Sequence, residues 1–207
     1  MERKETYKEQ IELIKQMLSE KYNQSFEVKS IGGRWGTLTN NTFECICSPD
    51  NNKEIVFEAE AACDGSFLSD EFITRLICKG LDEQLSVAIN RKSSDFAVLV
   101  EAFPSKIEED KKLTYEEFLE LDEAYDFNYY IAVKESVFEQ LSGQINSALV
   151  RMPNMRCRVH YYLTDENVVN DFAMFSKEHT HIEGKMGDIL DECEEKYYTI
   201  SNGKIAE

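Results

Sequence analysis

Phe-Ala-Val-Leu-Val at residues 96–100 is apolar at five consecutive positions. A strand with one face in water alternates apolar and polar side chains, whereas a strand covered on both faces stays apolar throughout. We therefore expect residues 95–103 to form a central strand of a sheet, with packing on each of its faces. The other elements are assigned outward from this strand.

The residues before this strand switch between helical and strand patterns. Apolar side chains recur at steps of three and four from Tyr7 to Tyr22, which is typical of an amphipathic helix. Ser69 is a favourable N-cap and marks the start of a longer helix. The expected elements are a helix at 4–22, short strands around 26–28 and 43–47, a strand at 54–61 and a helix at 69–91.

The residues after this strand contain a second series of elements. Thr114 with Glu117, and Ser136 with Glu139, have the spacing of capping boxes, which predicts a short helix after the first pair and a longer one after the second. Residues 156–163 alternate between apolar and polar side chains, which predicts a strand with one wet face. The expected elements are strands at 128–134 and 156–163, helices at 136–150 and 166–175, a helical stripe from 182 to 197 and a turn at 201–203.

The order of these elements predicts an α+β fold, with a mostly antiparallel sheet packed on one side by the helices at 4–22, 69–91 and 136–150. A strand-helix-strand order occurs twice, so two related β-α-β halves are an alternative. The acidic stretch 104–127 has few apolar residues and is the expected boundary. We expect an N-terminal α+β unit at 1–103, an acidic connector at 104–127 and a C-terminal α+β unit at 128–207, or one domain that contains all three.

Composition and charge exclude several classes of function. The chain has 207 residues, 42% of them hydrophobic, with 12 Phe and 10 Tyr, which is too aromatic for a disordered protein. The formal net charge of -17 opposes direct binding to nucleic acid or to an anionic membrane. The opening MERKETYKEQ is charged where a secretory signal is apolar, so we expect a cytoplasmic protein with no membrane partner.

The six cysteines form no CxxC pair, so we expect reduced and mostly buried thiols. Cys157 lies three positions before His160, and Arg156 and Arg158 flank it, which keeps a cysteine-dependent hydrolase as an alternative. Residues three apart on a strand face opposite sides of the sheet. We therefore expect no direct hydrogen bond between Cys157 and His160.

The other two histidines, His179 and His181, form a His-x-His pair with Glu178 and Glu183 nearby. Such a pair can hold a metal ion when both rings point the same way. His160 could approach this pair in space as a third histidine, but no fourth ligand is visible in the sequence, and the pair lies between two expected helices. We interpret it as an ordinary surface loop and expect no metal and no cofactor.

The sequence contains no P-loop, GxGxxG, HExxH or GxSxG motif. Gly32, Gly33 and Gly36 surround Arg34 and Trp35, but a strand pattern rather than a helix follows them, which favours a hairpin corner over a phosphate-binding loop. We therefore expect no enzymatic activity, with a cysteine- or metal-dependent hydrolase as the alternative.

The first 65 residues carry a resemblance. A charged N-terminal helix leads into KYNQSFEV at residues 21–28, followed by Gly32-Gly33, by Cys47-Ser48-Pro49 and by the strand that begins at Ile55. This arrangement resembles a group of uncharacterised bacterial proteins that are linked to mobile elements or to the cell envelope. The resemblance implies no activity and no site residue.

The expected function is that of a non-enzymatic accessory module that binds another protein. The alternative in the same class is an acidic DNA mimic that inhibits a nuclease or a DNA-binding protein, because spaced carboxylates can imitate a phosphate backbone. Exposed Trp and Arg dominate binding hot spots, and acidic side chains would form the mimic. The candidate interface residues are Arg34, Trp35, Glu116, Glu117, Glu120 and Glu123.

Overall fold

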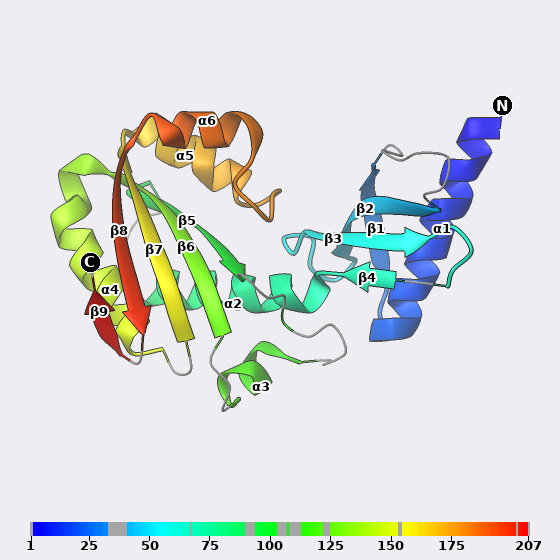
Figure 1. Ribbon diagram of the computed structural model, residues 1–207, viewed down its shortest axis with the longest axis horizontal. Coiled ribbons are helices and arrows are strands. Elements are labelled where there is room, and N and C mark those ends of the chain that lie inside the picture. Colours follow the sequence, from blue (N-terminus) through cyan, green and yellow to red (C-terminus); the bar gives the residue numbers. More distant parts are fainter. Residues whose placement is uncertain are drawn as a thin grey trace.

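The computed structural model describes most of the chain, namely residues 2–32, 41–66, 68–89, 94–102, 107, 113–121, 125–152, 155–201 and 203–206. Within these ranges, six α-helices and nine strands form two mostly antiparallel sheets, which confirms the α+β class. The two sheets lie side by side along the longest axis of the molecule, and one helix runs from the first sheet to the second (Figure 1). In the described part of the chain, no helix is both long and apolar enough to cross a bilayer.

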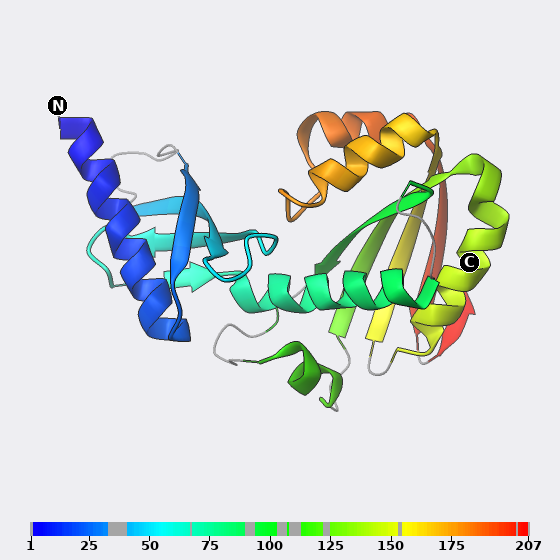
Figure 2. The same ribbon diagram turned by 180° about the vertical axis from the view of Figure 1, so that it is seen from behind.

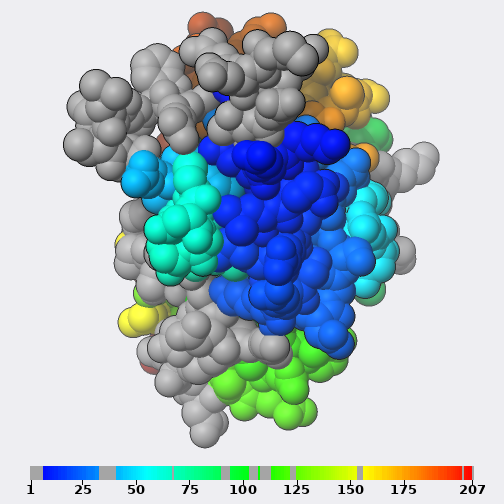
Figure 3. Space-filling view, turned by 90° about the vertical axis from the view of Figure 1, so that its right-hand side faces the viewer, coloured from blue at the N-terminus to red at the C-terminus, as the bar shows by residue number. Residues whose placement is uncertain are grey.

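The N-terminal sheet is a four-stranded antiparallel meander covered by one helix. Its strands pair in the order β1-β2-β3-β4, and α1 lies across one face on the outside of the molecule (Figure 3). Ile14 and Leu18 of α1 are fully buried against the sheet, where the apolar stripe of the sequence predicts them. The elements are α1 (Glu2–Tyr22), β1 (Phe26–Ile31), β2 (Thr42–Pro49), β3 (Phe57–Ala62) and β4 (Leu68–Asp70).

The C-terminal sheet has five strands in the order β5-β6-β7-β8-β9, and only the β6–β7 pair is parallel. Helices α2 and α4 pack on one face, and α5 and α6 cover part of the other (Figure 2). The strands are β5 (Phe96–Ala102), β6 (Tyr125–Lys134), β7 (Met155–Thr164), β8 (Glu194–Ser201) and β9 (Lys204–Ala206). The helices are α2 (Phe72–Ile89), α3 (Tyr115–Leu119), α4 (Phe138–Val150), α5 (Glu166–Phe175) and α6 (Gly184–Asp191), with a 3-10 turn η1 (Glu135–Val137) before α4.

The strand at 96–100 is buried on both faces, as expected, but it is not central. β5 is the edge strand of its sheet, yet each residue from Phe96 to Val100 is at most 7% exposed. Helix α2 covers one face of β5 and α5 covers the other. An apolar run indicates that both faces of a strand are covered by other elements, but it does not indicate whether another strand pairs with each edge. The prediction of a central strand is therefore wrong.

The sheet arrangement also corrects the sequence-based topology. There are two sheets rather than one, and the C-terminal sheet has helices on both faces instead of one. β3 and β5 belong to different sheets, so the first strand-helix-strand run is no β-α-β unit, whereas β6-α4-β7 is one. β5 pairs with β6 and so belongs to the sheet of the C-terminal half. The division of the chain into domains stays a prediction.

Three local predictions are wrong in detail. Ser69 lies in β4, and the carboxylate of Asp70 accepts the first helical N–H, from Phe72, at 3.0 Å. Helix α4 begins after η1 without a side-chain cap, so Ser136 and Glu139 form no capping box. The helical stripe expected from 182 to 197 ends with α6, because residues 194–201 form β8 beside β7. The capping box of Thr114 and Glu117 is confirmed.

Gly80 allows α3 to dock on α2. A Cβ atom at Gly80 would overlap the ring of Tyr115, whose hydroxyl donates to Gln84 of α2. We expect Gly80→Ala to lower the free energy of unfolding by about 1–3 kcal/mol, because the ring must leave its site. In a Tyr115→Ala background, Gly80→Ala should instead raise the free energy of unfolding by about 0.5–1 kcal/mol, because alanine is more stable than glycine in the interior of a helix. Urea unfolding of the four proteins measures both values, and equal signs in the two backgrounds would contradict the prediction.

Candidate functional site

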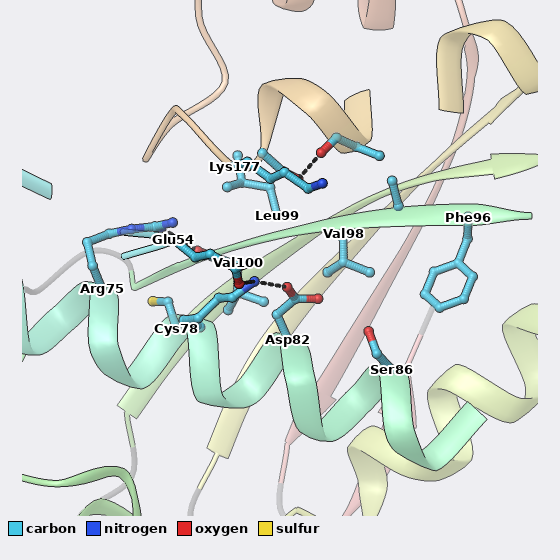
Figure 4. A pocket seen from close by; sticks show the side chains of 14 residues that line it. Glu54, Arg75, Cys78, Asp82, Ser86, Phe96, Val98, Leu99, Val100 and Lys177 are labelled. Carbon is cyan, nitrogen blue, oxygen red and sulfur yellow. Dashed lines mark hydrogen bonds and ion pairs between the residues drawn. The ribbon is translucent and has the colours of Figure 1, made fainter. Parts of the chain in front are cut away.

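The outer edge of β5 lies along a groove between α2 and α5, which we call the edge groove (Figure 4). Its volume is about 210 Å³. In the described part of the chain, no strand pairs with β5 on this side. The groove is lined by Arg75, Cys78, Lys79, Asp82 and Ser86 of α2, by residues 96–100 of β5, by Ala173 of α5, by Ser176 and Lys177 just after it, and by Glu54.

Every second residue of β5 presents its backbone polar groups to the edge groove. The carbonyl oxygen of Asp95 accepts from the N–H of Lys134 at 3.0 Å. This bond shows which residues of β5 direct their backbone groups toward β6, namely Asp95 and every second residue after it. Hydrogen-bonded pairs of an antiparallel ladder recur every two residues. The backbone groups of Phe96, Val98 and Val100 therefore face outward. The oxygen of Val100 accepts from Arg75 Nη1 at 3.0 Å, in agreement with this phase.

Small side chains contribute to both walls of the groove beside the larger charged ones. Cys78 and Ser86 line it from α2, and Ala173 and Ser176 from the opposite side. Burial raises the pKa of the Cys78 thiol to about 11, so this cysteine stays protonated and acts as a small apolar group. Small walls leave space beside the strand edge that larger residues would fill.

Positive charge prevails at the rim of the edge groove, although the whole chain carries a net charge of -17. Three cations and two carboxylates line it. Lys79 lies between Glu54 at 3.8 Å and Asp82 at 3.7 Å, whereas Lys177 is exposed and forms no ion pair with a described residue. Burial raises the pKa of Asp82, and the nearby Lys79 opposes this shift. The rim therefore favours an acidic group over a basic one.

A polar cluster of Glu101, Asn128, Tyr130 and His181 lies at the end of β5. Glu101 Oε2 accepts from the Tyr130 hydroxyl at 3.0 Å and from Asn128 Nδ2 at 3.3 Å. Its other oxygen, Oε1, pairs with His181 Nδ1. The second ring nitrogen of His181 lies 3.9 Å from Glu71 Oε2, just before α2. One imidazole therefore lies between two carboxylates that come from different parts of the chain.

The two partners in this cluster shift each other's pKa in opposite directions. The hydrogen bond to Glu101 raises the pKa of His181, burial opposes the shift, and the charges of Glu101, Glu71 and Glu58 add to it. Burial alone would raise the pKa of Glu101, but the hydrogen bonds from His181, Tyr130 and Asn128 together lower it. The cluster therefore favours the imidazolium form, which has no free lone pair for general-base catalysis.

The structure separates the three histidines. His160 stacks on Tyr130 with ring centroids 5.0 Å apart, and its Nδ1 lies 2.6 Å from Glu195 Oε1. His179 stacks on Phe175 at 3.9 Å and bonds to the Phe175 carbonyl oxygen, whereas His181 pairs with Glu101. Among the described residues, no group of three or more His, Cys, Asp and Glu side chains is placed to hold a metal ion.

Cys157 is buried in the core on the face covered by α2 and α4, whereas His160 lies on the opposite face with Tyr130. Burial raises the pKa of the Cys157 thiol to about 12. The expected separation of this pair is confirmed, and the thiol is not an activated nucleophile.

The predicted interface residues are only partly described. Arg34, Trp35 and Glu123 lie outside the described residues. Glu116, Glu117 and Glu120 are exposed on or just after α3, where the Glu117 carboxylate accepts the N–H of Thr114 at 2.8 Å. The structure thus places two of the acidic candidates on the five-residue helix α3 and the third, Glu120, at its C-cap.

Sequence reasoning missed the edge groove and the Glu101–His181 pair. Residues 96–100 give no local signal for the groove, because an apolar run indicates that both faces of a strand are covered and does not indicate which edge is unpaired. The pair joins residues that are 80 positions apart, and no local pattern connects them.

No family model and no curated protein matches the chain. A crystal structure of a DUF5037 family protein from Ruminococcus gnavus ATCC 29149 is similar, with a TM-score of 0.71 and 14% sequence identity. The alignment covers 95% of this chain and 94% of that one. The association with mobile elements or the cell envelope stays a prediction. Over almost its whole length, the chain thus shares the fold of a DUF5037 family protein.

Proposed function

We propose that this protein is a binding module that adds an extended segment of a partner protein to the outer edge of β5. The observation that carries the proposal is an edge strand that is buried on both faces, while the groove along its edge is open. β-strand addition needs such an edge, because main-chain hydrogen bonds supply affinity and pockets for alternate side chains supply specificity.

The backbone groups of β5 favour this function. Phe96 and Val98 direct their N–H and C=O groups into the groove, and main-chain donors and acceptors of this kind pair with those of an added strand. Arg75 satisfies the next outward carbonyl, that of Val100, and closes this end of the groove. A partner strand would supply the same kind of hydrogen bonds along the rest of the edge.

The chemistry of the groove indicates what the partner segment carries. The small walls at Cys78, Ser86, Ala173 and Ser176 suit apolar side chains of modest size. The exposed Lys177 suits an acidic side chain in the same segment. We propose an extended apolar segment with at least one carboxylate, from a protein that is not yet identified, and an accessory role in the cytoplasm rather than catalysis.

Filling the groove tests the proposal. Ser86 is exposed on α2 and its side chain points toward β5 (Figure 4), so Ser86→Trp should occupy the groove without disturbing the core. Peptides selected from a displayed random library against the native chain should bind Ser86→Trp at least about tenfold more weakly, a difference of about 1.4 kcal/mol. Titration calorimetry measures the affinities, and amide hydrogen exchange should show that the peptide protects residues 96–98.

Val87→Trp is the matched control, because Val87 is the next residue on α2, is 79% exposed and does not line the groove. It should bind the selected peptides like the native chain. Equal affinities for Ser86→Trp and the native chain, or a selection that yields no binding peptide, would refute strand addition at β5.

A further inference from the structure

The segment that connects α5 to α6, residues 176–183, forms part of one wall of the edge groove and is tied down at its far end. Ser176 and Lys177 line the groove. Four residues further on, the imidazole of His181 pairs with Glu101 of β5. Arg75 Nη1 also contacts the segment, at 3.5 Å from the Thr180 carbonyl oxygen, while it donates to Val100 of β5. We call residues 176–183 the linker.

The edge groove is small for the segment that it is proposed to bind. Its volume of about 210 Å³ lies below the range of about 300–1,000 Å³ that is common for ligand clefts. Helix α2 is anchored in the main core, whereas the linker is held by the His181 pair, by the Arg75 contact and by the packing of His179 on Phe175 and of Ile182 on the smaller core. The linker side of the groove is therefore the side that can widen at the lower cost.

Negative charge surrounds the His181 ring. Glu101 and Glu71 face its two nitrogens, and Glu58 of β3 acts on it through space. Glu183, at the start of α6, adds to the negative field at Glu58, and burial raises the Glu58 pKa. The groups that face the ring or its partners are Glu101 of β5, Glu71 before α2, Glu58 of β3, Glu183 before α6, Tyr130 of β6 and Arg75 of α2.

We propose that the His181–Glu101 pair is a pH-sensitive latch that holds the linker on β5 and thereby restricts the edge groove. With the proton on the ring, the imidazolium offsets the carboxylates on either side of it. When the proton is lost, the ring keeps one N–H but no charge, so its attraction to Glu101 and Glu71 weakens and the linker is held less tightly. The effect on partner binding rests on the proposed function, whereas the latch itself does not.

The direction of the pH dependence follows from the two shifts. His181 has a pKa above its ordinary value of 6.5 in the folded chain, so the stabilisation is complete below 6.5 and is lost as the pH rises through the raised pKa. Glu101 has a lowered pKa, so the pair is also lost when the pH falls through that lower value. The latch is closed between these limits and opens toward alkaline pH.

Hydrogen exchange of the full chain tests the latch without any ligand. From about pH 6 to about pH 9, after correction for intrinsic exchange, protection of the linker amides should fall roughly tenfold for each pH unit by which the His181 pKa is raised. His181→Gln should show low protection at every pH. His179→Gln should keep the native pH dependence, because His179 stacks on Phe175 and takes no part in the pair.

An NMR titration of the His181 ring gives a second readout. Glu101→Gln should bring its pKa back toward the ordinary value. Linker protection that does not change with pH in the native chain, or a His181 pKa that is the same in Glu101→Gln, would overturn the latch. Suppose that peptides whose binding is weakened by Ser86→Trp bind the native chain equally well at about pH 6 and about pH 9. That result would overturn only the link between the latch and partner binding. A pH-dependent linker without any groove-binding peptide would retain the latch and refute the proposed function.

Discussion

Asp70→Ala is expected to lower the free energy of unfolding by about 3–5 kcal/mol, because it removes one member of a buried ion pair. The Asp70 side chain is fully buried and accepts from Lys21 Nζ at 2.9 Å and from the Tyr22 hydroxyl at 2.7 Å. It also accepts the Phe72 N–H at the start of α2, at 3.0 Å. Alanine would remove the acceptor of the buried Phe72 N–H and the carboxylate that pairs with the Lys21 ammonium. Chemical denaturation with fluorescence detection measures the loss.

Asp70→Asn separates charge from hydrogen bonding. Its amide oxygen can still accept from Tyr22 and from the Phe72 N–H, while the pairing with the Lys21 ammonium is lost. We expect a decrease of about 1.5–3 kcal/mol, the range for a hydrogen bond to a charged group. If the Asp70→Ala protein is as stable as the Asp70→Asn protein, or more stable, the hydrogen bonds of Asp70 do not hold α1 and α2 together as described.

Phe172→Ala should cost about 3–5 kcal/mol and should loosen α5 and α6 from the C-terminal sheet. Phe172 is fully buried in the smaller of the two cores, where α5 and α6 pack on β5 and β6. This core contains seven buried residues, so the loss of its largest side chain leaves α5 and α6 with little apolar anchorage. Hydrogen exchange should show lost protection in α5, α6 and the linker, together with a lower denaturation midpoint.

Met174→Ala is the control on the same helix, because Met174 is 70% exposed. Its effect should stay within about 0.5 kcal/mol. Since the core that contains α2 is separate, Phe172→Ala should leave the protection of α2 largely unchanged. Equal losses of protection in α2 and α5 would show that the two cores unfold as a single unit.

Most element types could be predicted because they depend on neighbours within one or two turns. The stripe that includes Ile14 and Leu18 specifies α1, and the alternation of Cys157 and Val159 with Arg158 and His160 specifies the two faces of β7. The capping box of Thr114 is equally local. These features involve residues that stay close in any compact fold.

The errors arise where distant segments compete for the same residues. The apolar stripe that ends at Tyr197 fits a helix, but residues 194–201 gain a full ladder of hydrogen bonds beside β7. Ser69 has the composition of an N-cap, but pairing with β3 places it in a strand and moves the capping role to Asp70. Tertiary hydrogen bonds outweigh the small local preferences in both cases.

The α+β class, the location of most helices and strands and the faces that they bury follow from the amino-acid sequence, because periodicity and capping are short-range effects. The edge position of residues 96–102, the groove beside them and the contact of His181 with Glu101 across 80 positions emerge only when the chain is packed. Strand order and site assembly depend on which distant surfaces pack together, and that choice minimises the free energy of the whole chain rather than of any one segment.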